Sequence, residues 1–390
     1  YSRAYLHHLT KTGETLGWQL LGKHNLHFYH QLMQEIRESI LSDRFIELYR
    51  EKRAFLHEAD MDNPIRAQKS KRTKTLRLGN YEVHKAWEGF ASIRQISSGE
   101  IMHSRTAPME EARTLYVEQS NLAERVRLAA NEESAPATGL VIWDVGLGAA
   151  ANAMAAINCY EEQAAAGPVR PLRMVSFEND LDSLRLAFRH NRDFPYLRHS
   201  GPAAILTNGS WQSRQHPGLS WLLVPGDFLE TLSHAPGPPD LIFYDMFSTK
   251  TSADQWTLAA FRRLFEACAG NAAELFTYSC STANRACLLA AGFYVAKGRN
   301  AGEKIETTIA FTPAALNSSN GSRHELLSSD WLGKWSRSAA KFPDEILPNE
   351  QSVFEQAIRC HNQFEIRPKF ETTNPEHETR SELVARPSKN

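Results

Sequence analysis

Four acidic residues in the middle of the sequence each follow a short apolar run, and their spacing indicates a single binding site. They are Asp144, Glu178, Asp227 and Asp245. If the apolar runs are parallel strands of one sheet, the four acids meet at its carboxyl edge, in the crevice where such sheets bind ligands. The alternative is that they are turn acids that cap helices.

A glycine-rich turn, Asp144-Val-Gly146-Leu-Gly148, stands between the first apolar run and an Ala-rich stretch. Glycines let a backbone approach a ligand closely, and the start of the helix behind them is electropositive. The continuation to Ala151 also fits the dinucleotide pattern, but a nicotinamide enzyme carries its ribose-binding acid about 20 residues further on. Here the acid at the end of the next strand, Glu178, lies 30 residues after Gly148.

The charge of this site favours S-adenosylmethionine over a nicotinamide cofactor. A carboxylate beside the turn would repel a pyrophosphate, whereas S-adenosylmethionine carries an ammonium and a sulfonium group. We expect Asp144, with the backbone of Gly146 and Gly148, to hold the methionine part. Glu178 is expected to bind the two ribose hydroxyls, and Asp227 the adenine amino group.

The elements that must position these residues alternate between strands and helices. Strands are expected at residues 140–145, 172–177, 221–224, 241–244, 274–278 and 293–296, and helices at 181–190, 258–268 and 282–291. This alternation predicts an α/β fold with a doubly wound, mostly parallel, Rossmann-like sheet.

Residues 1–58 have a different pattern, with apolar residues at helical spacing. The pattern is formed by Leu26, Tyr29, Leu32, Met33, Ile36 and Ile40. It predicts a short all-helical segment with a buried apolar stripe. Two or three helices of this size bury little surface alone, so we expect them to need a partner.

The chain is thereby divided into five parts. They are the helical segment 1–58, a basic linker 59–80, the α/β domain 81–312, an accessory helical extension 313–370 and a tail 371–390 that we expect to be disordered. Within the linker, the stretch from Arg66 to Arg77 has six basic residues and no acid. It is either a solvated hinge or an arm that contacts RNA phosphates.

The composition excludes several classes of protein. The chain has 390 residues, of which 42% are hydrophobic and 23% charged, as in a globular protein with a core. It has no run of 18 apolar residues, so no contact with a membrane is expected. Five scattered cysteines suit reduced thiols in the cytoplasm. Because the sequence begins with Tyr1 and not with Met, we interpret it as part of a longer chain.

A series of short motifs between about residues 82 and 311 resembles the MnmC-like methyltransferase family. The motifs are Glu111-Ala-Arg113, Glu118 to Leu122, Asp144-x-Gly146-x-Gly148-x-x-x-Asn152, Ser176-Phe-Glu178, Gly226-Asp227, Asp245-Met-Phe247 on to Trp256, and Ala291-Gly292-Phe293. Members of this family complete 5-methylaminomethyl-2-thiouridine at the wobble position of tRNA. The resemblance adds Asn152 to the residues expected at the cofactor.

This resemblance implies a transferase that uses S-adenosylmethionine to methylate a nitrogen of a tRNA base. Asp245 would orient the acceptor amine and take up its proton. Phe247 and Trp256 would stack on a splayed base, unless they are ordinary core aromatics. The family usually has the pattern D-G-F-x-P where this chain has Asp245-Met-Phe-Ser-Thr249, so the acceptor can differ from that of the family.

The beginning of the chain is similar to another family, bacterial-type tRNA-guanine transglycosylase (queuine tRNA-ribosyltransferase), which serves queuosine synthesis. The similar segments are Tyr1-Ser-Arg-Ala-Tyr-Leu-His-His-Leu9 and His24-Asn-Leu-His-Phe-Tyr29, which match the C-terminal end of that family. The resemblance implies that His24 is a zinc ligand together with three cysteines just upstream of Tyr1. Since the first 158 residues contain no cysteine, zinc is expected only in a full-length parent.

Both resemblances imply tRNA as the partner, and relatives of the transglycosylase are dimers, although the sequence does not indicate an oligomeric state here. Two other functions stay open. The α/β domain could be a non-catalytic tRNA-binding module on a transglycosylase fragment. It could also be an aminopropyltransferase similar to spermidine synthase, because that class has the same sheet and the same acids.

Overall fold

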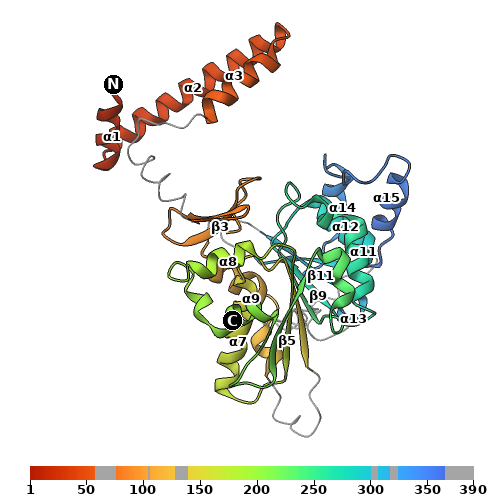
Figure 1. Ribbon diagram of the computed structural model, residues 1–390. Helices are drawn as coiled ribbons and strands as arrows, with labels where there is room; N and C mark the ends of the chain where they lie inside the picture. Colours follow the sequence, from red (N-terminus) through yellow and green to blue (C-terminus); the bar gives the residue numbers. More distant parts are fainter. Residues whose placement is uncertain (58–75, 104–105, 128–138, 300–305, 317–323, 365–390) are drawn as a thin grey trace, which may run out of the picture. The chain divides into compact units, whose positions relative to one another are not determined.

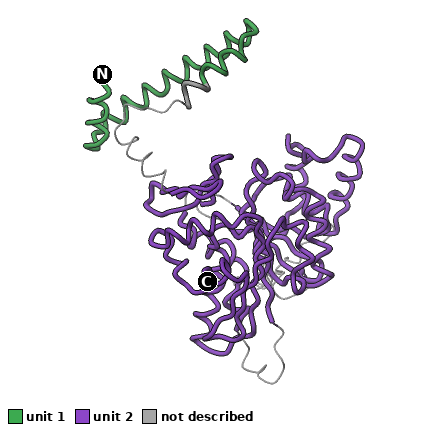
Figure 2. The backbone as a smooth tube through the Cα atoms, viewed as in Figure 1, with its two compact units in different colours: residues 1–72 green, residues 73–390 purple. Residues whose placement is uncertain are grey.

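The computed structural model describes residues 1–57, 76–103, 106–127, 139–299, 306–316 and 324–364 (Figure 1). The chain divides into two units, residues 1–72 and 73–390 (Figure 2). Most of the expected linker and the whole of the expected tail lie outside the described residues.

The described part of the first unit, residues 1–57, forms three helices. They are α1 (Arg3–Lys11), α2 (Thr15–Leu41) and α3 (Phe45–His57). Ser2 begins α1 as a cap, because its hydroxyl accepts a hydrogen bond from the backbone N–H of Tyr5. Gly13 has a φ of 75°, which allows the chain to turn between α1 and α2. Gly17 fits closely against Leu9, since a Cβ atom on Gly17 would lie 2.9 Å from the Leu9 Cβ.

The apolar stripe of α2 is not buried within this unit, which corrects the sequence-based expectation. Leu26 is 71% exposed, Tyr29 63% and Met33 60%. The helix has 27 residues, and its two shorter neighbours cannot cover it along its length. The expectation that these helices need a partner stays a prediction, and the exposed apolar side chains are consistent with it.

None of the helices in the described ranges combines the length and the apolar composition that crossing a membrane requires.

The second unit is built on an eight-stranded sheet with the order β10-β11-β9-β8-β4-β5-β7-β6. Its parallel centre consists of β4 (Leu140–Val145), β5 (Leu172–Glu178), β7 (Leu219–Pro225), β8 (Leu241–Tyr244) and β9 (Glu274–Thr277). The chain adds β5 and β7 on one side of β4 and then returns to β8 on the other side. The sheet therefore has a switch point between β4 and β8, where open α/β sheets bind ligands.

Three further strands complete this sheet with antiparallel pairing. They are β6 (Ser210–Gln212) beside β7, β11 (Thr307–Phe311) beside β9, and β10 (Tyr294–Gly298) beside β11. Sequence analysis predicted β10 but neither β6 nor β11. The predicted fold class, a doubly wound and mostly parallel sheet after a short helical segment, is confirmed.

Helices cover both faces of the sheet, because the strands bury side chains on both sides. One face carries α7 (Ala151–Ala166), α8 (Asp182–Arg189) and α9 (Ser200–Asn208), and the other carries α11 (Leu258–Ala267) and α12 (Thr282–Ala291) (Figure 1). Alternate residues of β4 enter different cores, so that Ile142 packs with the first group and Trp143 with the second.

A small antiparallel sheet precedes the large one. It consists of β1 (Arg77–Leu78), β2 (Tyr81–Lys85) and β3 (Ala91–Gln95), and it was not predicted. The expected linker thus ends in β1 and its turn. Short helical segments follow at α5 (Pro108–Ala112), at a π-helical turn (Arg113–Glu118), at α6 (Leu122–Val126) and, after β7, at α10 (Phe228–Thr231).

After β11 the chain continues through α13 (Pro313–Leu316), α14 (Ser329–Ser336) and α15 (Gln351–Arg359). Ala315 of α13 packs in the first core, whereas α14 and α15 pack on the second core through Trp331, Trp335, Phe354 and Ile358, all buried. The described part of residues 313–370 is thus joined to the α/β unit by apolar contacts.

Candidate active site

A cavity of about 790 Å³ lies at the carboxyl ends of β4, β5, β7 and β8. Tyr81 of β2 and residues 99–103, which follow β3, complete its wall. Seven of the residues predicted from the sequence line it, namely Gly146, Gly148, Asn152, Glu178, Asp227, Asp245 and Phe247. Asp144 and Trp256 are not lining residues.

The glycine turn after β4 needs its glycines for steric reasons. Gly146 has a φ of 90°, and a Cβ atom there would lie 2.8 Å from the backbone oxygen of Asp245. Gly148 has a φ of 52°, and its Cβ would lie 3.2 Å from the sulfur of Met102. Any larger residue at Gly146 would therefore displace the strand end that carries Asp245.

The first helix after this turn begins without a side-chain cap. Ala150 is its N-cap residue and has a φ of 62°, a left-handed conformation that is unusual for alanine. An alanine has no oxygen to accept hydrogen bonds from the first N–H groups of α7. Because Ala149, Ala151 and Asn152 line the cavity, the electropositive start of α7 faces the space where a ligand would lie.

Glu178 is held in place at the end of β5 before any ligand binds. The backbone N–H of Gly148 donates to its Oε2 atom at 2.9 Å, and that of Asp180 donates to Oε1 at 3.0 Å. Burial raises the pKa of Glu178, and these backbone hydrogen bonds partly oppose that shift. The carboxylate is thus preorganised, with lone pairs left over for two hydroxyl groups.

Asp227 lies at the end of β7 and caps α10. Its Oδ1 atom accepts from the backbone N–H of Leu229 at 2.8 Å, and Oδ2 accepts from the side-chain amide of Gln255 at 2.9 Å. The sequence-based alternative, a helix-capping acid, is therefore correct for this residue. Asp227 also lines the cavity, so capping and ligand binding are compatible.

Asp144 lies behind the cavity wall. It is fully buried, and its Oδ2 atom accepts a hydrogen bond of 2.7 Å from Ser176, whose Oγ accepts in turn from the Trp221 indole at 2.9 Å. Its Oδ1 atom has no hydrogen-bond partner among the described residues. Burial raises the pKa of Asp144 to about 8, so the carboxyl is mainly protonated at neutral pH. A buried, neutral acid does not hold an ammonium group directly.

Asp245 lies at the end of β8, at the bottom of the cavity. The side-chain amide of Asn152 donates to its Oδ2 atom at 2.8 Å. Burial raises the pKa of Asp245, whereas the nearby positive charge of His103 and the bond from Asn152 oppose the shift. The contact with Asp245 gives Asn152 a positioning function in addition to its place on the wall.

His103 and Glu111 were not given a functional role by sequence analysis, and both line the cavity near Asp245. The Nδ1 atom of His103 lies 3.1 Å from Glu111 Oε2. Burial lowers the pKa of His103, but its hydrogen bond to Glu111 and the charges of Glu111 and Asp245 outweigh burial and raise the pKa overall. One feature of the sequence pointed to this pair, because Glu111 belongs to one of the motifs that resemble the methyltransferase family.

The two predicted stacking aromatics differ in position. Phe247 lines the cavity, as expected for a residue beside the acceptor. Trp256 is only 3% exposed, and its indole packs against Tyr244 and Phe261 while its N–H donates to the backbone oxygen of Phe247 at 2.7 Å. Trp256 is therefore a core aromatic that supports Phe247, which is the alternative that the sequence left open.

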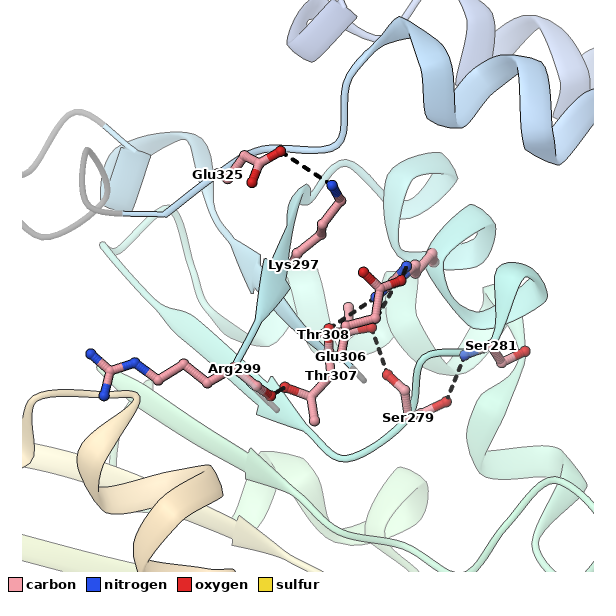
Figure 3. A network of polar contacts seen from close by, with 9 residues as sticks. Ser279, Ser281, Lys297, Arg299, Glu306, Thr307, Thr308 and Glu325 are labelled. Carbon is pink, nitrogen blue, oxygen red and sulfur yellow. Dashed lines mark hydrogen bonds and ion pairs between the residues drawn. The ribbon is translucent and has the colours of Figure 1, made fainter. Parts of the chain in front are cut away.

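Tyr278, after β9, completes the wall on this side, and its hydroxyl donates to the backbone oxygen of Met246 at 3.0 Å. A network of polar contacts fixes the loop that begins with it (Figure 3). Thr308 of β11 donates to the backbone oxygen of Ser279 at 2.6 Å, and the buried guanidinium of Arg285 donates to the Thr308 hydroxyl at 2.9 Å. The strand β11 thereby holds Ser279, which directly follows the wall residue Tyr278.

His24, the predicted zinc ligand, lies on α2 with its side chain exposed to solvent. Its Nδ1 atom is 3.5 Å from the Asn25 side-chain oxygen. The described residues contain no group of three or more His, Cys, Asp or Glu side chains that could hold a metal ion. The residues present therefore do not form a zinc site around His24.

Two family models match separate parts of the chain. Residues 1–58 match queuine tRNA-ribosyltransferase, and residues 211–313 match S-adenosyl-L-methionine-dependent methyltransferase. Queuine tRNA-ribosyltransferase of Agrobacterium fabrum is 52% identical over 62 residues, which are 16% of this chain and 16% of that protein. The enzyme of Zymomonas mobilis is 52% identical over 54 residues, 14% of each chain. The chain thus spans only about a sixth of the length of these relatives.

Among solved structures, the crystal structure of MNMC2 from Aquifex aeolicus has a similar fold. The alignment has a TM-score of 0.50 and 19% sequence identity, and it covers 81% of this chain and 98% of that one. Both resemblances that the sequence indicated are confirmed. Residues 1–58 are thus similar to queuine tRNA-ribosyltransferase, residues 211–313 match the methyltransferase model, and the fold is similar to that of MNMC2.

Proposed function

We propose that residues 73–390 transfer a methyl group from S-adenosylmethionine to a nitrogen atom of a tRNA base. The charge of the cavity carries this proposal. The described residues that line it include six acids, Glu100, Glu111, Glu178, Asp227, Asp245 and Asp254, and neither Lys nor Arg. These carboxylates would repel the pyrophosphate of a dinucleotide and attract the ammonium and sulfonium groups of S-adenosylmethionine. The methyltransferase model over residues 211–313 supports the same class.

The residues of the cavity fit the methyl donor part by part. The open N–H groups at the start of α7 would receive the carboxylate of its methionine part, and the glycine turn leaves space for it. Glu178 would accept from the two ribose hydroxyls, and Asp227 from the adenine amino group. Asp144 would act indirectly, since it supports the end of β4 from behind the wall.

Asp245 is proposed to prepare the acceptor. When bound, S-adenosylmethionine supplies a methyl group on a positively charged sulfur atom. An acceptor amine must lose its proton before it can attack that methyl carbon, and Asp245 would hold the amine by a hydrogen bond and take up the proton. Asn152 orients the carboxylate at 2.8 Å, and Phe247 would lie against the base. Most of the rate enhancement would come from this positioning.

Calorimetry with the full chain tests the donor site. We expect binding of S-adenosylmethionine in the micromolar range, and at least an about tenfold loss of affinity in Glu178→Ala and in Asp227→Ala, as for removal of a hydrogen bond to a charged group. Asp344→Ala, a change at an exposed acid outside the cavity, is the matched control. No binding by the wild-type chain, or an unchanged affinity in Asp227→Ala, would contradict the proposal.

The acceptor is identified by mass spectrometry of the nucleosides in tRNA from cells with and without the gene. A methylated nucleoside that disappears with the gene supports the proposal, and an aminopropylated one supports the spermidine-synthase-like alternative. If the donor binds and no nucleoside changes, the α/β domain is a binding module and not a tRNA methyltransferase.

The helical segment is proposed to share this substrate class. Its relatives are named for action on tRNA, and a common substrate would explain why the two parts are joined. Since tRNA is modified in the cytoplasm and the cysteines of the chain are free thiols, we propose that the protein works there. No step is assigned to zinc, because the described residues do not provide its ligands.

A further inference from the structure

Glu100 joins two walls of the cavity that are far apart in the sequence. It lies in the segment after β3, and it accepts three hydrogen bonds from the loop after β8. The backbone N–H of Ser248 donates to Oε1 at 2.9 Å, the Ser248 hydroxyl donates to Oε2 at 2.9 Å, and the Thr251 hydroxyl donates to Oε2 at 2.6 Å. Glu100 forms no ion pair within the described residues. The partners of its carboxylate there are the hydrogen-bond donors of this loop.

The loop held by Glu100 carries the residue proposed to meet the acceptor base. Phe247 directly precedes Ser248, and its backbone oxygen accepts from the Trp256 indole at 2.7 Å. The backbone oxygen of Met246 accepts from Tyr278 at 3.0 Å. The loop is therefore fixed by Tyr278 and Trp256 on its core side and by Glu100 on its other side.

The three contacts join one backbone N–H group and two hydroxyl groups of the loop to a single carboxylate. Hydrogen bonds to a carboxylate are stronger than those between neutral groups, so three of them can hold residues 248–251 in place.

We propose that Glu100 is a specificity-determining residue, which positions Phe247 relative to Asp245 by holding residues 246–252 and thereby selects the acceptor base. This proposal rests on the proposed methyl transfer to tRNA. Glu100 acts through the loop and takes no part in the proton transfer, so it is a positioning residue.

The holding of the loop is tested by hydrogen exchange of the full chain, read by mass spectrometry over residues 246–252. In Glu100→Ala we expect hydrogen exchange over residues 246–252 to be faster by at least about tenfold. This is the effect expected from the loss of one hydrogen bond to a charged group. The loop variant Ser248→Ala with Thr251→Val should have a similar effect, and combining it with Glu100→Ala should add little. Glu88→Ala, an exposed acid before β3, is the control and should change nothing.

Selection of the acceptor is tested with tRNA from cells that lack the gene. Glu100→Ala should raise the KM for this tRNA at least about tenfold. It removes one of the six cavity charges, but this carboxylate already accepts three hydrogen bonds from the loop, so the affinity for S-adenosylmethionine should fall by much less than the tenfold expected for Glu178→Ala and Asp227→Ala. Glu100→Gln keeps one acceptor oxygen and should lie between wild type and Glu100→Ala. A purely structural defect would instead lower donor affinity and acceptor kinetics together.

Four outcomes overturn the proposal. Unchanged exchange in Glu100→Ala shows that Glu100 does not hold the loop, and faster exchange with an unchanged KM shows that the loop does not select the acceptor. A tenfold loss of affinity for S-adenosylmethionine in Glu100→Ala shows that Glu100 acts on binding of the methyl donor and not on selection of the acceptor. If the wild-type chain binds no S-adenosylmethionine, the proposed function fails and the specificity role with it, while the exchange data still decide whether Glu100 holds the loop.

Discussion

At the scale of single residues, the acids of the chain have two kinds of environment. Glu178 and Asp227 already accept hydrogen bonds from the protein and also face the cavity. Asp144 is buried behind the wall, with one oxygen atom unsatisfied among the described residues. Their sequence positions are alike, at strand ends. What separates them is their surroundings, since Asp144 lies inside β4 and is fully buried, whereas Asp227 follows β7 and lines the cavity.

The buried carboxyl of Asp144 makes stability depend on pH. Its pKa is raised from 3.8 to about 8 by burial, so between these values the folded state binds one more proton than the unfolded state. Stability is therefore full at low pH and falls as pH rises through this window, by at most about 1.4 kcal/mol per pH unit. In Asp144→Asn we expect a smaller decrease of Tm between pH 5 and pH 8 than in wild type, measured by calorimetric scans.

The same variant distinguishes support from contact. Because Asp144 does not line the cavity, Asp144→Asn should keep its affinity for S-adenosylmethionine within a few-fold of wild type. A loss of tenfold or more would restore the direct contact that the sequence suggested. Asp344→Asn, at an exposed position, serves as the control for the pH scans.

His103 is expected to determine the pH range of activity. Its positive charge opposes the burial that raises the pKa of Asp245, so removal of the charge in His103→Asn should raise that pKa further. If Asp245 must be ionised to take up a proton, the acidic limb of the pH–rate profile then moves to higher pH. Single-turnover rates between pH 6 and pH 9 measure this shift. His234→Asn, on an exposed residue, should leave the profile unchanged, and an unshifted limb in His103→Asn would exclude the role.

At the scale of elements, the turn after β4 is the least tolerant part of the site. In Gly146→Ala the new Cβ would meet the Asp245 backbone at 2.8 Å, and φ would stay at a strained 90°. We expect at least an about tenfold loss of donor affinity together with a lower Tm, because strain of about 1–3 kcal/mol must be relieved by moving a strand end. Gly167→Ala, where no heavy atom lies within 4 Å, is the matched control. Unchanged affinity in Gly146→Ala would show that the turn does not touch the ligand.

Sequence patterns predicted the elements whose burial is strong and local. The central strands β4, β5 and β8 are mostly apolar and bury side chains in both cores, because both faces of the sheet are covered by helices. The strands β1 to β3 are short and carry charged residues such as Arg77, Glu82 and Lys85, so no apolar period marks them. The strand β11 begins with threonines whose partners, Arg285 and Gln119, are remote in the sequence. Long-range polar contacts of this kind leave no local pattern to read.

The same reasoning applies to the site. The strand-end acids and the glycine turn could be predicted because the topology of a parallel sheet brings strand ends together. The contacts of Glu100 with Ser248 and Thr251 could not, since they connect a small sheet that was not predicted to a loop about 150 residues away.

At the scale of the whole molecule, the chain has two units of unequal character. Every described residue that lines the cavity belongs to the unit 73–390. The first unit instead exposes large apolar side chains, among them Trp18, Leu26 and Tyr29. Among the described residues the cavity is thus lined by the second unit alone, whereas the helical unit presents exposed apolar side chains.

The basic residues that lie in the sequence between the helical segment and the α/β domain form either a hinge or an RNA-binding arm. Substitution of these residues distinguishes the two. Changing Arg66, Lys69, Lys71 and Arg72 to Gln should weaken binding of tRNA and lessen the slope of log affinity against log salt by about 3, if these side chains neutralise phosphates. Filter-binding measurements of tRNA affinity at salt concentrations from about 50 to 300 mM give this slope. An unchanged slope would identify the segment as a hinge, and donor affinity should be unaltered in either case.

The left-handed Ala150 and the uncapped start of α7 have a consequence for the lifetime of the protein. Without ligand, the first turn of α7 lacks a side-chain acceptor, and Ala150 keeps a strained conformation. A ligand that binds only the folded state adds RT ln(1 + [L]/Kd) to its stability, about 2.7 kcal/mol at a hundredfold excess over Kd. Resistance to heat and to proteolysis would then follow the supply of the methyl donor, so that a methyl-starved cell holds a less durable form of this chain.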